Sequence, residues 1–175
     1  MGSMKSRLAG ISLALSLSGL AMPASAQGWF MGGSFGKSEV GGWCDVDFGD
    51  CDDTDSGWKL FAGNELNKSA AIEFSYANLG EVTDVGISVE IESFGVSAVG
   101  LIPLGPAGNI FGRFGLQRWD LSTEFGGDSG TDPFYGVGVS VGGGQGFGFR
   151  AEWERYDLED DDVDFLSFGI TFAFK

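Results

Sequence analysis

The side chains that could perform chemistry are few in kind. The chain has 175 residues, with no histidine, two cysteines and 25 acidic against 10 basic residues. Without imidazole a Ser–His or His–Asp catalytic arrangement is impossible, and no Ser–Lys pair stands out in its place. We therefore expect no enzyme and no cofactor. The net charge of -15 also argues against nucleic-acid binding, which needs a basic surface.

Two acidic clusters are candidates for binding divalent cations. Neither matches the calcium-loop pattern of an EF-hand, so a solvated acidic rim is the favoured interpretation. Binding of divalent cations is the second hypothesis. The clusters comprise Asp45, Asp47, Asp50, Asp52, Asp53 and Asp55, and then Asp157, Glu159, Asp160, Asp161, Asp162 and Asp164.

The first 26 residues predict an export signal. Residues 1–3 precede a second Met and look like a remnant of cloning. A basic start at Lys5 and Arg7 is followed by an interrupted apolar stretch and by the small-residue cleavage site at 24–26. The apolar stretch is too short for a spanning helix, which needs about 20 apolar residues. We expect residues 1–26 to be removed and residues 27–175 to form one domain.

The two cysteines share the first acidic cluster. Because an exported protein meets an oxidising environment, a disulfide between Cys44 and Cys51 is the default expectation. Two thiolates cannot complete a tetrahedral metal site, and no histidine is present to help. The sequence therefore predicts a disulfide and no metal centre.

Alternation with a period of two residues dominates the rest of the chain, most clearly at 166–174, where bulky apolar residues alternate with small or polar ones. Short turns alternate with longer, mostly acidic connections around 38–56, 80–85, 120–133 and 158–163. This pattern predicts an all-β, eight-stranded antiparallel up-and-down barrel. The expected strands are about 29–37, 57–66, 70–79, 86–102, 109–119, 134–142, 146–157 and 164–174.

The two faces of each strand decide which solvent surrounds the barrel. Charged residues such as Lys59 share a face with small ones, whereas Trp58 and Leu60 lie on the other face. Glycine, serine and a few paired charges fit an eight-stranded lumen, and many large residues do not. The large face should point outward, where lipid stabilises it, so we predict a transmembrane barrel. A secreted lipocalin-like barrel is the soluble alternative. The expected aromatic girdles contain Trp29 and Phe174 at the turn end and Trp58, Tyr76, Tyr135 and Tyr156 at the loop end.

Four segments carry a resemblance to a known family. Residues 57–63 (GWKLFAG) and 71–76 (AIEFSY) resemble the second and third strands of the OmpA-like outer-membrane β-barrel family, of OmpX/OmpA type. Residues 134–139 (FYGVGV) and 149–156 (FRAEWERY) are similar to its sixth and seventh strands. The resemblance covers essentially residues 27–175. It implies the bacterial outer membrane, with lipid and lipopolysaccharide around the barrel and the loops outside the cell.

The last strand resembles the recognition signal that the barrel assembly machinery reads during biogenesis. Ile170, Phe172 and Phe174 supply its apolar positions, and Lys175 follows the aromatic residue that usually ends such chains. Two other positions depart from the family pattern, because Asn64 stands where an aromatic is common and Val99 where a cation is common.

Six charged residues are the most specific internal set. The resemblance implies an inward carboxylate at Glu73 and an inward cation at Arg150. Alternation independently places both inside, together with further candidates. Charges in so narrow a lumen must be paired, so they form either a seal or a gate that opens by exchanging partners. The predicted lumen network is Lys59, Glu73, Arg113, Arg150, Glu152 and Glu154.

Three classes of membrane function remain open at this point, beside the secreted lipocalin-like binder. A monomeric structural or surface protein, contributing to envelope integrity and adhesion through its loops, is the first. A narrow pore for small polar or amphipathic solutes is the second. A lipid-modifying enzyme is the least favoured of the membrane functions, because no catalytic set is recognisable.

Overall fold

The computed structural model describes residues 28–41, 54–84, 87–105, 108–123, 126–142, 146–158 and 161–174. The predicted export signal, Cys44, Cys51, and Lys175 lie outside the described residues, as does most of the first acidic cluster. No helix in the described ranges is long and apolar enough to cross a membrane.

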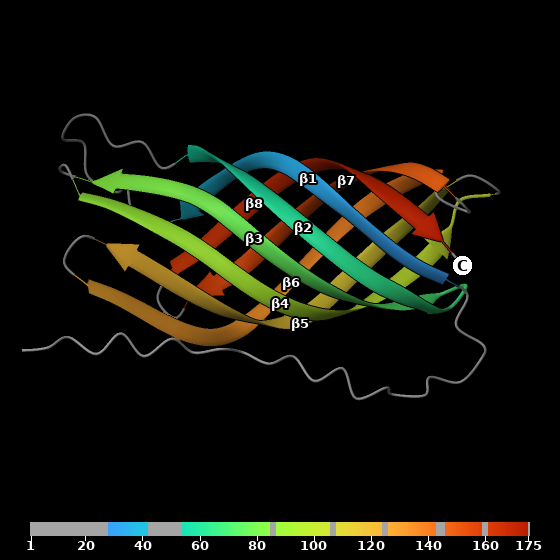
Figure 1. Cartoon of the computed structure of the whole chain (residues 1–175), viewed down its shortest axis with the longest axis horizontal. Helices are drawn as coiled ribbons and strands as arrows, with labels where there is room; N and C mark the ends of the chain where they lie inside the picture. Colours follow the sequence, from blue (N-terminus) through green and yellow to red (C-terminus); the bar gives the residue numbers. More distant parts are fainter. Residues whose placement is uncertain are drawn as a thin grey trace, which may run out of the picture.

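Eight strands form one closed barrel (Figure 1). Each strand pairs antiparallel with its neighbours in the chain, and the first strand closes the barrel by pairing with the last. The predicted eight-stranded up-and-down topology is therefore confirmed. The strands are β1 (Gly28–Gly41), β2 (Thr54–Asn67), β3 (Ala70–Asp84), β4 (Ile87–Pro103), β5 (Gly108–Thr123), β6 (Gly126–Gly142), β7 (Gly146–Leu158) and β8 (Asp161–Phe174).

A band of exposed apolar side chains encircles the barrel next to the short turns. Along β8 it runs from Leu166 to Phe174, where every second side chain is large, apolar and exposed. At about 3.3 Å per residue and a tilt near 40°, such a segment spans roughly 20 Å of the barrel axis. That height is close to the apolar band of outer-membrane barrels, about 25 Å. Only hydrocarbon makes this surface stable, which excludes the soluble lipocalin-like alternative.

The band ends sharply, because the outward positions of each strand change from apolar to polar. On β1 Lys37 follows Phe35, and on β5 Arg118 follows Leu116. Aromatic pairs mark this border, including Trp58 with Tyr76 at 5.5 Å between ring centroids. We call the part of the barrel inside the band the membrane half. The strand ends beyond it, which carry the long connections, are the loop half.

The strands extend further into the loop half than predicted. Residues 38–41, 80–84, 120–123, 126–133 and 161–163 were expected to be loop and are strand. The acidic residues that suggested loops are the outward half of an alternating strand: Asp162 and Asp164 alternate with Val163 and Phe165, which are fully buried. The acidic connections are therefore shorter than predicted, and acidic residues such as Asp162 and Asp164 lie on the outer face of the strands.

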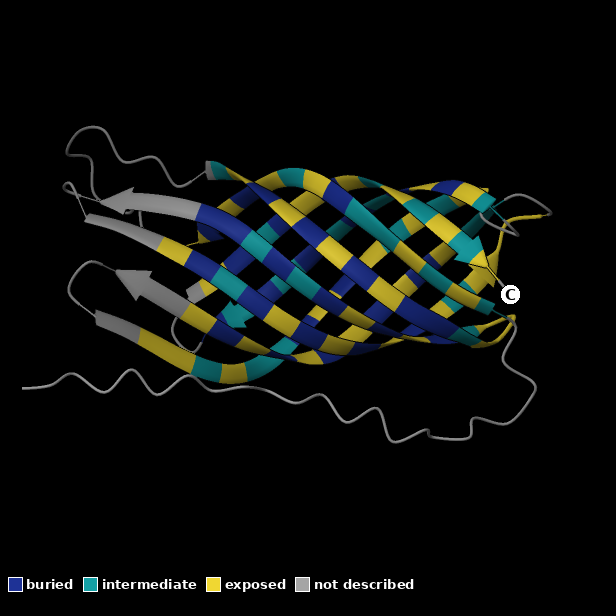
Figure 2. Cartoon of the chain, in the orientation of Figure 1, coloured by how far each residue is buried: buried dark blue, intermediate teal, exposed yellow. Residues whose placement is uncertain are grey.

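The interior of the loop half is mainly apolar, as in a water-soluble protein. Buried and exposed positions alternate along the strands (Figure 2). The apolar interior corrects the expectation that only small or paired polar residues fill the lumen. It also corrects Tyr156, which was expected in the outer girdle and is buried inside. The apolar plug consists of Val40, Ala77, Leu79, Ile91, Trp119, Phe134, Tyr156, Leu158, Val163 and Phe165.

Glycines on the inner face make room for these aromatic rings. A Cβ on Gly115 would lie 2.2 Å from the carbonyl oxygen of Val96 and 2.6 Å from the ring of Phe134. A Cβ on Gly130 would lie 2.4 Å from the ring of Trp119. The rings of Phe134 and Trp119 thus lie over glycines of nearby strands, which is how a narrow barrel can contain them.

Candidate functional site

All six residues of the predicted charge network meet in the lumen of the membrane half. Each sits at an inward position of its strand, and its two neighbours in the chain point outward, so alternation positions it. All six are buried. They come from four strands: Lys59 from β2, Glu73 from β3, Arg113 from β5, and Arg150, Glu152 and Glu154 from β7.

Arg113 lies at the centre of the network and contacts all three carboxylates. Its Nη1 donates to Glu154 Oε1 at 2.7 Å, its Nε lies 2.9 Å from Glu152 Oε1, and its Nη2 donates to Glu73. Lys59 donates to Glu152 at 2.8 Å and also to Glu154. Residues from opposite walls are thereby joined across the barrel.

Arg150 forms the layer of the network nearest the turn end. Its Nη1 donates to Glu73 Oε2 at 2.7 Å, and its Nη2 donates to Glu152 Oε1 at 3.0 Å. The guanidinium carbon also lies 4.6 Å from the ring centroid of Phe61 and 4.3 Å from that of Phe111. Cation–π contacts of this kind are stronger when water is excluded.

The network is balanced, with three cations against three carboxylates. Because each charge has an opposite partner, the cost of removing these groups from water is offset within the lumen. Every carboxylate accepts from two cations, so none is a free base or nucleophile. Among the described residues no group of three acidic or cysteine side chains is arranged to hold a metal ion.

Between the network and the loop end, the apolar plug closes the lumen. Phe134 and Tyr156 stack at 5.3 Å between ring centroids with an interplanar angle of 6°, and both are buried. Beside them Ser93 donates to Gln117 Oε1 at 2.5 Å, and Gln117 donates to the carbonyl oxygen of Asp157 at 2.9 Å. The plug is the part of the site that sequence reasoning missed.

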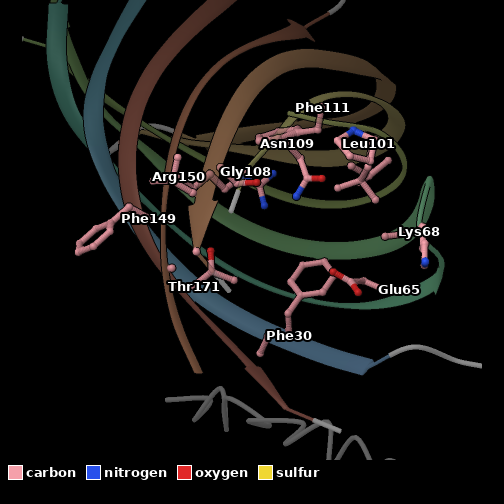
Figure 3. A pocket seen from close by; sticks show the side chains of 18 of the residues that line it. Phe30, Glu65, Lys68, Leu101, Gly108, Asn109, Phe111, Phe149, Arg150 and Thr171 are labelled. Carbon is pink, nitrogen blue, oxygen red and sulfur yellow. The ribbon is translucent and has the colours of Figure 1, made fainter. Parts of the chain in front are cut away.

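On the other side of the network, a cavity of about 280 Å³ opens at the turn end (Figure 3). Glu73 and Arg150 line its inner end, and Phe30 and Phe111 line its walls. Val99, where the family commonly has a cation, is a buried apolar residue here and packs with Phe111. Asn64 is buried on β2 and donates to the carbonyl oxygen of Gly28 at 3.3 Å.

Of the second acidic cluster, Asp157, Asp162 and Asp164 lie on the outer face of the loop half, whereas Glu159, Asp160 and the side chain of Asp161 lie outside the described residues. On that outer face Arg155 binds Asp164 with both ends of its guanidinium, at 2.7 and 2.6 Å, which raises the pKa of Arg155. Partial burial, followed by the neighbouring Asp162, raises the pKa of Asp157. The three apolar residues of the predicted assembly signal, Ile170, Phe172 and Phe174, are exposed on the outer face of β8.

Comparisons with known proteins agree with this architecture. The model of the outer membrane protein beta-barrel domain family matches residues 11–175. No curated protein sequence matches significantly. Among solved structures, Neisserial surface protein A (NspA) has a TM-score of 0.65 at 15% identity, covering 83% of this chain and 97% of that one.

Two further structures show the same fold. The N-terminal beta-barrel domain of Pseudomonas aeruginosa OprF has a TM-score of 0.60 at 18% identity, covering 85% of this chain and 99% of that one. The attachment invasion locus protein Ail of Yersinia pestis, solved with the heparin analogue sucrose octasulfate, has a TM-score of 0.56 at 20% identity. That match covers 84% of this chain and 99% of Ail. The closed eight-stranded barrel, its apolar belt and the family match together identify this chain as a member of the outer membrane protein β-barrel domain family, located in the bacterial outer membrane.

Proposed function

We propose that this protein is a non-conducting structural and surface protein of the outer membrane, which supports envelope integrity and presents its loops for adhesion. The observation that carries the proposal is the apolar plug. Trp119, Phe134 and Phe165 fill the lumen of the loop half and are at most 2% exposed. A solute that entered from the periplasmic turn end would meet first the paired charges and then this plug.

The narrow-pore alternative requires a water path through both layers. Exchange of partners among the six charges could open the first layer, but it leaves the apolar rings in place. The enzyme alternative requires a free nucleophile or base, and the clustered ionisable groups are committed to each other. We therefore infer a protein without catalytic activity and without a cofactor.

The charge of the loop half favours a cationic partner for adhesion. Among the residues whose side chains the structure describes, its outward positions carry three basic ones, Lys37, Arg118 and Arg155. They also carry seven acidic residues, namely Glu39, Glu90, Glu92, Asp120, Asp157, Asp162 and Asp164. This surface would repel a polyanion such as the heparin analogue bound by Ail, and it would attract a basic protein surface.

Two further partners and the oligomeric state belong to the same proposal. The barrel assembly machinery would read the last strand with Ile170, Phe172 and Phe174 during biogenesis. Divalent cations would bridge the acidic loop half to lipopolysaccharide phosphates. The folded protein would act as a monomer, since the closed barrel leaves no strand edge to pair with another copy.

Single-channel recording in planar bilayers tests the proposal. The wild-type protein should give no conductance steps, whereas a general porin inserted under the same conditions should conduct. A double variant that truncates two rings of the plug, Trp119→Ala with Phe134→Ala, is recorded for comparison with the same amount of protein inserted. Resolved steps from the wild-type protein, abolished by neutralising Glu73, would instead support the pore.

A further inference from the structure

The turn-end cavity has a polar and aromatic lining that a purely structural role does not use. It is closed on the inner side by Arg150 and Glu73 and is open toward the periplasm. Phe30, Val99, Leu101 and Phe111 provide apolar walls. At about 280 Å³ it is near the lower limit of small-molecule pockets, which begin at roughly 300 Å³. The cavity therefore has room only for a small molecule.

The inner end of the cavity has no charge to offer an anion. Arg150 lines the cavity but is bound to Glu73 and Glu152, and its guanidinium carbon lies over the rings of Phe61 and Phe111. Within the network the three cations and three carboxylates cancel. Selectivity by charge must therefore come from the mouth of the cavity.

Of the two charged side chains that line that mouth, Lys68 is exposed to solvent, and Glu65 is the distinctive group. It is half-buried and lines the cavity, yet among the described residues it has no hydrogen bond and no cation within ion-pair distance. The network carboxylates, by contrast, each accept from two cations. A carboxylate partly removed from water without a partner has lost hydration and gained nothing in return. A ligand cation would supply what is missing.

The surroundings of Glu65 specify which cation fits. Glu65 and Phe30 are diagonal neighbours on the inner faces of β2 and β1, because Gly28 pairs with Glu65 and Phe30 pairs with Gly63. Figure 3 shows both side chains directed into the same space, with Asn109 and Thr171 across it. An ammonium group can bind the carboxylate, donate to the amide and hydroxyl oxygens, and place its alkyl chain against the rings.

A bare metal ion fits this mouth less well. Calcium requires six to eight oxygen ligands, and one carboxylate with an amide and a hydroxyl is too few. We propose that the turn-end cavity binds a small primary amine from the periplasm, with its ammonium group on Glu65 and its alkyl chain between Phe30 and Phe111. The amine enters and leaves by the same opening, since the network and the plug close the other side.

NMR titration of the isotope-labelled, folded protein in detergent micelles tests this assignment. n-Butylamine should shift the signals of Asn109 and Thr171 saturably, whereas n-butanol, which has the same chain without the charge, should bind at least tenfold more weakly. Glu65→Gln should weaken butylamine binding by roughly ten- to a hundredfold, the range expected for loss of a charge-assisted hydrogen bond. Glu39→Gln, which removes an exposed carboxylate from the loop half, is the matched control and should bind normally.

Three outcomes would overturn the proposal. They are equal binding by Glu65→Gln, equal binding of butanol, and saturable binding of calcium at Asn109 and Thr171 in place of the amine. If Glu65→Gln does not fold, as judged by heat-dependent gel mobility, Phe30→Leu takes its place. That variant keeps the carboxylate and should weaken butylamine binding severalfold, and unchanged binding there would count against the ring contact.

Discussion

The balance of the lumen network predicts strong coupling between Arg113 and Glu73. Arg113→Met removes one of three buried cations and leaves three carboxylates with two partners. Glu73→Gln leaves three cations with two carboxylates. Since an uncompensated buried charge typically costs about 3–5 kcal/mol, each single variant should lose that much unfolding free energy.

The double variant should restore the balance. It keeps Lys59 and Arg150 against Glu152 and Glu154, with the contacts at 2.8 Å from Lys59 to Glu152 and 3.0 Å from Arg150 to Glu152 intact. Replacement of a whole buried pair by neutral residues is often nearly neutral. Additive losses would total about 6–10 kcal/mol, and we expect about 4 kcal/mol or less, a coupling of at least ~2 kcal/mol.

Urea unfolding of the protein folded into lipid vesicles, followed by tryptophan fluorescence, measures all three values. Arg113→Met combined with the distant Glu39→Gln is the control pair, and its losses should add. If the losses from Arg113→Met and Glu73→Gln also add, or if Arg113→Met leaves the unfolding midpoint unchanged, the network does not stabilise the barrel by charge balance.

Two further predictions concern the outer surface. On the outward face of β6, Val139→Arg should lower the unfolding free energy by about 2–4 kcal/mol because it places a charge in the apolar band. Thr131→Arg, on the same face but in the loop half, should have little effect. Equal losses from the two variants in vesicle unfolding would contradict this border. Burial and Asp162 raise the pKa of Asp157 above its ordinary value of 3.8. Because the folded state therefore binds the proton of this carboxyl more tightly than the unfolded state does, the unfolding free energy should rise as the pH falls from neutral through the raised pKa. Asp157→Asn should therefore raise the melting temperature at neutral pH and reduce this pH dependence, and a lower melting temperature would refute the assignment.

The topology and the location of the charge network could be predicted because both depend on a local rule. Alternation fixes which side of a strand a residue faces, and Lys59, Glu73 and Arg113 obey it without exception. The choice of partners could not be predicted in the same way. Arg113 on β5 reaches Glu73 on β3 and Glu154 on β7, and these contacts depend on the stagger of strands that are not neighbours.

The apolar plug was missed although its signal is present. Tyr156 has the same parity as Glu152 and Glu154, and Trp119 has the same parity as Arg113. Alternation alone would have placed both rings inside. Large side chains are not expected in so narrow a barrel, but glycines such as Gly115 and Gly130 leave the space in which the rings of Phe134 and Trp119 lie.

Along a single strand, the apolar residues face outward in the membrane half and inward in the loop half. This change limits how the sequence can vary. In the membrane half, an outward position tolerates leucine and does not tolerate aspartate. In the loop half, the preference at outward positions is the reverse. Along one continuous β-strand, the preference at outward positions therefore changes from apolar to charged residues within two residues. Saturation mutagenesis of the outward positions would therefore locate the border of the membrane on this barrel from the tolerated residues alone.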